Sequence, residues 1–162
     1  MRSATAAVPI RQESLGETLG PIHRAWLEEA RCLLEPALDA GADFWTRWAA
    51  IRYLSDDFRE QFRLEHGLVN ELCPFLPPEA SERLLRGGDR ILHLRLHLER
   101  LERKGRRAVT SELAVATRDL LEQLGVWCAE IETAARDVGP GDLPVDAAFL
   151  IDQLRDGLEA CV

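Results

Sequence analysis

Residues 89–104, DRILHLRLHLERLERK, decide the fold class, because they alternate apolar and polar residues as a strand does and yet carry the ends of a helix. The alternation covers residues 91–98. Asp89 can accept hydrogen bonds from the first turn of a helix, and Lys104 followed by Gly105 is typical of a last turn. The two ends therefore predict a helix over 89–104 rather than a strand.

Prolines, glycines and capping residues divide the rest of the chain into further helical segments, with no Asn-Gly or Asp-Gly hairpin turn between alternating strands. We expect a first helix that opens at Gly20-Pro21 and runs to about Asp39, with Pro36 kinking or shortening its end, and a second from Asp43 to about Cys73. A short helical piece follows over 79–86 and ends at Gly87-Gly88. Beyond the helix 89–104, we expect one helix from Thr110 or Ser111 to before Gly139 and another over 144–161. Four main helices with short connections predict an all-α protein, an antiparallel up-down-up-down four-helix bundle with a fifth C-terminal helix.

Length and composition fit a single soluble domain. The 162 residues suit one domain over 1–162, with 1–13 as a flexible N-terminal arm and 144–161 as an accessory helix. The 20 Lys and Arg residues against 28 Asp and Glu give a net charge of −8, which disfavours nucleic acid or an anionic membrane as partner. No apolar run approaches a membrane span, and the N-terminal sequence lacks the apolar region of a signal peptide, so we expect a cytoplasmic protein.

Cysteine spacing and motif content disfavour several enzyme classes. The cysteines are far apart in sequence and predict reduced, partly buried thiols rather than a zinc site or a redox dithiol; they are Cys32, Cys73, Cys128 and Cys161. The chain contains no GxSxG, P-loop or HExxH motif, which disfavours a hydrolase, a kinase and a zinc protease. We therefore predict no catalytic residues.

The chain has four histidines, and two lie on the first and second predicted helices. His23 falls near the middle of an apolar arc and is predicted to point into the core. His66 lies on the border of the next apolar arc, and Glu65 falls inside it. A carboxylate in that position would be buried and would need a partner or a metal.

The other two histidines, His93 and His97, are spaced one helical turn apart, which lets two imidazoles reach one metal ion. Arg95 and Glu99 project to the opposite side, which resembles the solvated side, so both histidines are predicted to face inward. On the next helix Glu130 lies at the edge of the core arc. Glu132, two residues later on the same helix, projects outward.

Two interpretations of these histidines stay open. Each one can be a core or border histidine with a satisfied hydrogen bond. Together they can instead form one polar or metal site between facing helices, where imidazole and carboxylate ligands suit iron, zinc or manganese.

The chain resembles the hemerythrin-like family, the HHE cation-binding domain, through His23, the HxxxH pair of His93 and His97, and residues 58–76 with their apolar-proline end. The resemblance implies a four-helix bundle with a mono- or dinuclear non-haem iron site. Asn70 stands where the family has an acid, and Trp127 or Val126 stands where it has a fourth-helix histidine. The implied ligand set is therefore incomplete; it consists of His23, Glu65, His66, His93, His97 and Glu130.

Two functions follow as hypotheses. The resemblance implies sensing of oxygen, nitric oxide or redox state, or iron handling. The alternative is a metal-free helical-bundle interaction or regulatory module of bacterial type, whose surface would be the fifth helix or the pair Trp45 and Trp48. Packing between helices is the commoner role for such tryptophans. The expected partner is another protein or a second copy of the chain, with no nucleic acid and no membrane.

Overall fold

The computed structural model describes residues 14–104, 110–136, 138, 143 and 145–159, and no strand occurs among them, so the all-α prediction is confirmed. The predicted arm over 1–13 and the turn at 139–141 lie outside the described residues. The helices are α1 (Leu15–Leu34), the 3-10 helix η1 (Pro36–Leu38), α2 (Phe44–Ser55), α3 (Asp57–Leu72), the 3-10 helix η2 (Cys73–Phe75), α4 (Pro78–Lys104), α5 (Thr110–Ala135) and α6 (Val145–Glu159).

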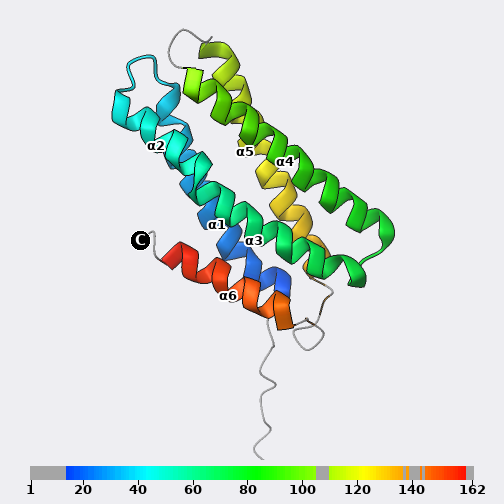
Figure 1. Ribbon diagram of the computed structural model, residues 1–162. Helices are drawn as coiled ribbons and strands as arrows, with labels where there is room; N and C mark the ends of the chain where they lie inside the picture. Colours follow the sequence, from blue (N-terminus) through cyan, green and yellow to red (C-terminus); the bar gives the residue numbers. More distant parts are fainter. Residues whose placement is uncertain (1–13, 105–109, 137, 139–142, 144, 160–162) are drawn as a thin grey trace, which may run out of the picture.

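The long helices lie side by side (Figure 1). α5 packs against α4 on one side and α1 on the other, and α2 and α3 follow one another beside α4. α6 packs on α3 and α1 near one end of the molecule. None of the described helices combines the length and the apolar character that a membrane crossing requires.

The first helix begins earlier than predicted. Ser14 forms a capping box with Glu17: the Ser14 hydroxyl accepts from the Glu17 amide at 3.3 Å, and the Glu17 carboxylate accepts from the Ser14 amide at 2.8 Å. α1 therefore starts at Leu15, and the prediction that Pro21 opens the helix is wrong, because Pro21 lies inside it. The expectation that Pro36 shortens this helix is confirmed, since α1 ends at Leu34.

The predicted second helix is two helices. Asp43 caps its start as expected, with its carboxylate accepting from the Thr46 amide at 2.8 Å. The chain then breaks at Asp56, whose φ of −115° and ψ of −76° separate α2 from α3. The prediction of one helix from Asp43 to Cys73 is therefore wrong.

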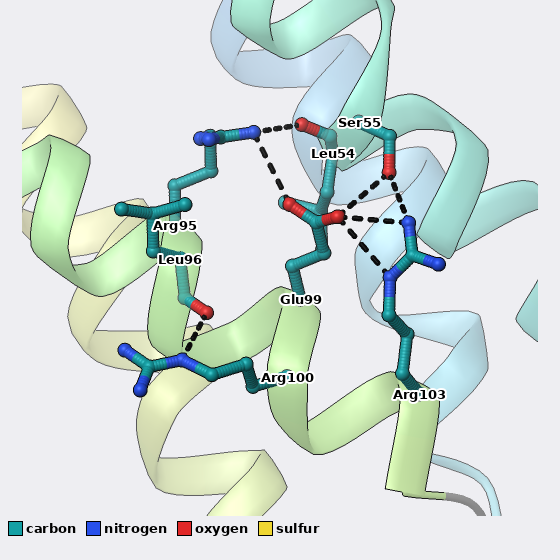
Figure 2. A network of polar contacts seen from close by, with 7 residues as sticks. All are labelled: Leu54, Ser55, Arg95, Leu96, Glu99, Arg100 and Arg103. Carbon is teal, nitrogen blue, oxygen red and sulfur yellow. Dashed lines mark hydrogen bonds and ion pairs between the residues drawn. The ribbon is translucent and has the colours of Figure 1, made fainter.

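Side chains of α4 bind the end of α2 at this break (Figure 2). The Arg95 guanidinium donates to the Leu54 carbonyl at 2.7 Å and to the Glu99 carboxylate at 3.3 Å. Glu99 also accepts from the Ser55 hydroxyl at 3.0 Å and from Arg103 at 2.9 Å. The bonds from Arg95 to Leu54 and from Ser55 to Glu99 hold the last turn of α2 against α4. They join residues that are distant in sequence, so no local pattern predicts them.

Gly87 and Gly88 do not interrupt α4, contrary to the predicted break. A Cβ atom on Gly87 would lie 2.5 Å from Cδ1 of Trp127, and one on Gly88 would lie 2.9 Å from Cδ2 of His66. The Trp127 indole also donates to the Leu84 carbonyl at 2.8 Å. The two glycines therefore let side chains of α3 and α5 approach the backbone of α4 closely.

One apolar core extends through the helices, and α6 contributes to it through Ala147, Ile151 and Leu154. Its largest fully buried side chains include Trp26, Trp127, Tyr53 and Phe58. Burial of such aromatic side chains supplies much of the stability of a helical domain of this size.

Candidate functional site

A buried histidine lies between two carboxylates in the core. Nε2 of His23 on α1 lies 3.3 Å from a carboxylate oxygen of Glu65 on α3, and Nδ1 lies 2.7 Å from a carboxylate oxygen of Glu132 on α5. The side chains of His23 and Glu65 are 1% and 0% exposed, and that of Glu132 is 31% exposed. We call these three residues the carboxylate–histidine triad.

Small residues on α1 make room for the triad. A Cβ on Gly16 would lie 2.5 Å from the Glu132 carbonyl oxygen, so α1 and α5 approach each other closely there. One turn later, a Cβ on Gly20 would lie 3.3 Å from the Arg24 guanidinium and 3.7 Å from the Glu132 carboxylate. Glycine at both positions lets Glu132 reach His23 while Arg24 lies near the same carboxylate.

The geometry of the triad fixes its proton content. A neutral imidazole has one N–H donor and one lone pair, yet both ring nitrogens of His23 face carboxylate oxygens. Both nitrogens can donate to these oxygens only when the imidazole carries two protons, so the geometry favours the protonated form of His23. Burial alone lowers the pKa of His23, but hydrogen bonds to and the charges of Glu65 and Glu132 outweigh it, so the pKa lies above its usual 6.5.

Cys128 lies near the same carboxylates and is 1% exposed. Burial, followed by the charges of Glu65 and Glu132, raises the pKa of the Cys128 thiol well above its usual value. The thiol therefore stays protonated, which makes it neither a nucleophile nor a ready metal ligand. The confirmed predictions here are the burial of His23 and of Glu65, which has His23 as its partner.

The inward orientation predicted for His93 and His97 is wrong, because both side chains are exposed. The core face of α4 instead carries Leu84, Ile91 and Leu98, together with Arg95, which is 6% exposed. Arg95 and Glu99, predicted to lie on the solvated side, form the network at the end of α2 (Figure 2).

The remaining predicted ligands are also apart. His66 is half-buried, packs against the Phe62 ring at 5.7 Å and lies 3.2 Å from the Asn70 amide. Glu130 is half-buried and lines a different part of the molecule, a groove formed by α4 and α5. Glu132, predicted to project outward, is instead the third member of the triad.

The structure does not bring the predicted ligand set together in one place. Of its members on different helices, the structure brings together only His23 and Glu65 among the described residues. Within the described ranges, no group of three or more His, Cys, Asp or Glu side chains is arranged to hold a metal ion. In the triad both imidazole nitrogens already face carboxylate oxygens, so a metal would have to displace one of these contacts.

Three aromatic side chains gather on the surface at the start of α2. Phe44, Trp45 and Trp48 are 68%, 72% and 49% exposed. The Phe44 ring lies 5.2 Å from Trp45, edge-on, and 6.3 Å from Trp48, stacked. We call them the α2 aromatic cluster. Packing between helices, the commoner role for Trp45 and Trp48, is not what the structure shows.

A second apolar surface lies near η2, in the groove that contains Glu130. It has a volume of about 550 Å³, and its lining is apolar apart from Arg83, Glu130 and Thr133. The apolar lining comes from η2, the residues that follow it, α4 and α5, and includes Phe75, Leu76, Ala80, Leu84, Val126 and Ala129.

No family model matches the chain, and neither the curated proteins nor the solved structures contain a match.

Proposed function

We propose that this protein is a helical-bundle interaction or regulatory module that binds a protein partner through the α2 aromatic cluster and needs no metal in its core. The observation that carries the proposal is the cluster itself: Phe44, Trp45 and Trp48 are exposed, and the Phe44 ring contacts Trp45 edge-on and Trp48 face to face.

Exposed aromatic side chains that touch one another differ from scattered apolar residues on a surface. Tryptophan and other aromatic residues are enriched at the centres of protein interfaces, where a few large side chains contribute most of the binding free energy. Contiguous apolar patches mark interaction sites more often than single exposed residues do. Rigid rings also lose little conformational entropy on binding.

The proposed architecture is an antiparallel four-helix bundle of α1, α2 with α3, α4 and α5, with α6 as the fifth helix. It is supported by packing of α5 on α4 and α1, and of α4 on α2 and α3. In such a bundle, the α2 aromatic cluster lies on the outside, away from the buried carboxylate–histidine triad. The carboxylate–histidine triad then stabilises the core, and the α2 aromatic cluster binds the partner.

Photo-crosslinking tests the proposed surface. A benzoylphenylalanine replacing Trp45 should yield a discrete covalent adduct with one partner protein in cells that express the full chain. The same amino acid replacing Arg155, exposed on α6, is the matched control. Equal adducts from both positions, or none from position 45, would overturn the proposal, and an adduct with a second copy would identify the partner as the chain itself.

The second candidate is a hemerythrin-like metal centre with an incomplete ligand set, used in oxygen, nitric oxide or redox sensing or in iron handling. It is favoured by one observation, the contact of buried His23 with buried Glu65 and half-buried Glu132, which places side chains from three helices together. Iron, zinc and manganese measured against protein concentration test it. A stoichiometric metal that is lost from Glu65→Gln and retained in the variant of an exposed carboxylate, Glu60→Gln, would support this candidate over the interaction module.

A further inference from the structure

His93 and His97 form a pair of exposed imidazoles on the outer face of α4. Residues four apart on a helix lie above one another on one face, with about one turn between them. The side chain of His93 is exposed and makes no hydrogen bond or ion pair within the described part of the chain. Both imidazoles can therefore adopt rotamers that direct a ring nitrogen to a common point outside the helix.

A carboxylate of the neighbouring helix lies beside this pair. Nε2 of His97 is 3.7 Å from Oε1 of Glu112 on α5, and the two side chains are 46% and 51% exposed. This separation is too long for a hydrogen bond. It is close to the roughly 3.4 Å that separates two ligands of a tetrahedral ion with bonds of about 2.1 Å. The distance between Nε2 of His97 and Oε1 of Glu112 therefore suits two ligands of one metal ion better than a direct hydrogen bond.

His97 and Glu112 also line a depression between α4 and α5. The depression has a volume of about 290 Å³ and is lined by His97, Glu112, Asp119 and Ser111 at its polar positions, over an apolar floor of Leu94, Val115 and Ala116. No lysine or arginine lines it. Carboxylates that line a depression without a lysine or arginine provide a favourable potential for a divalent ion.

We propose that His93 and His97 chelate one divalent transition-metal ion, such as Zn²⁺ or Ni²⁺, on the outer face of α4, with Glu112 as the third protein ligand. Imidazole suits these ions, and a carboxylate completes a set of two nitrogens and one oxygen with water in the open position. As the described side chains lie, no three of them are already arranged around an ion, so His93 rotates onto the site when the metal binds. The site is separate from the buried triad and goes beyond the proposed function.

NMR signals of the imidazole rings in the 162-residue protein test the proposal, because each histidine gives its own signal. Metal that binds at a thiol, such as that of exposed Cys32, does not contribute to these signals. Addition of Ni²⁺ should broaden the ring signals of His93 and His97 at the same metal concentration and leave those of His23 and His66 sharp. Zn²⁺ should shift the same two signals, and Mg²⁺, which prefers oxygen ligands, should shift neither.

Three variants separate the site from adventitious binding. His93→Gln and His97→Gln should each weaken binding by more than roughly tenfold, and Glu112→Gln should weaken it by a smaller factor. His66→Gln is the matched control and should bind as the unmodified protein does. The three sites are exposed, so folding should persist by circular dichroism. Unchanged affinity in the double variant His93→Gln/His97→Gln, or broadening of all four histidines together, would overturn the proposal.

Discussion

Gly87 of α4 lies directly against the indole of Trp127 on α5, with no space for a Cβ between them: the atom would stand 2.5 Å from Cδ1 and 3.2 Å from Nε1. The indole cannot move away easily, because it is 1% exposed and donates to the Leu84 carbonyl. The close contact of α4 and α5 therefore depends on glycine at this position.

Gly87→Ala should destabilise the protein by about 1–3 kcal/mol, because the added methyl group overpacks the contact with Trp127. The intrinsic helix preference of alanine, about 1 kcal/mol, offsets only part of this cost. Urea unfolding followed by circular dichroism measures the change.

Gly125→Ala is the matched control for this substitution. Gly125 also lies within a helix, but its nearest neighbour to an added Cβ is Leu27 at 3.9 Å, an ordinary contact. We expect this variant to be as stable as the parent or up to about 1 kcal/mol more stable. Equal destabilisation by the two alanines would show that the contact with Trp127 is not the cause.

The carboxylate–histidine triad should make stability depend on pH. The pKa of His23 is raised in the folded protein, so its stabilising contribution is complete below the unfolded value of about 6.5 and is lost as pH rises through the folded value. The free energy of unfolding should fall over that range, because the triad loses the proton that links His23 to Glu65 and Glu132. Urea unfolding at pH values from 6 to 8.5 measures it.

Glu132→Gln provides the comparison within the triad. It removes a charge that raises the pKa of His23 in the folded protein, so the loss of stability with rising pH should be smaller than in the parent and should end at lower pH. His97→Gln changes an exposed histidine and should leave the pH profile as it is. A parent profile that is flat across this range would contradict the proton content inferred for the triad.

Arg95→Met should destabilise the protein by about 1–3 kcal/mol, because it keeps the apolar stem but removes the donor to the buried Leu54 carbonyl. Arg100→Met is the control on the same helix. Its guanidinium donates to the Leu96 carbonyl at the surface, as Figure 2 shows, and its loss should cost no more than about 0.5 kcal/mol. Thermal and urea unfolding of both variants show whether the buried hydrogen bond of Arg95 contributes more to the free energy of unfolding than the exposed one of Arg100.

The double variant Trp45→Ser/Trp48→Ser should retain the stability of the parent within about 0.5 kcal/mol per site, because both side chains are largely exposed. Trp127→Leu, a change in the core, should cost several times more, about 3 kcal/mol. If the surface variant unfolds as readily as the core variant, the α2 aromatic cluster supports the fold rather than a partner.

Local signals in the sequence predicted the helical class and several ends. Asp43 caps α2, Pro36 follows the end of α1, and the strand-like run 91–98 is helical. His23 lies among apolar residues at helical spacing, and its burial followed from that spacing alone. The sequence-based predictions were correct where the structure depends on residues close together in the chain, such as a cap, a proline or the spacing of apolar residues within one helix.

The sequence could not show which face of α4 is buried. Leucines alternate along residues 91–98, so they are distributed around the whole helix, and Leu92 and Leu96 remain 36% and 37% exposed. A buried arginine then sets the orientation, because Arg95 bonds a carbonyl of α2 that is distant in sequence. The same limit applies to Glu132, which reaches His23 only because Gly16 lets α1 approach α5.

The break at Asp56 separates the helical phase of α2 from that of α3. In an uninterrupted helix, one inserted or deleted residue would rotate everything after it by about 100°, and Glu65 would leave the core. Here the chain starts a new helix at Asp57, so changes in length within α2 leave Glu65 opposite His23. The helical phase of the segment with the exposed aromatic side chains is thus independent of the phase of the helix that places Glu65 in the core.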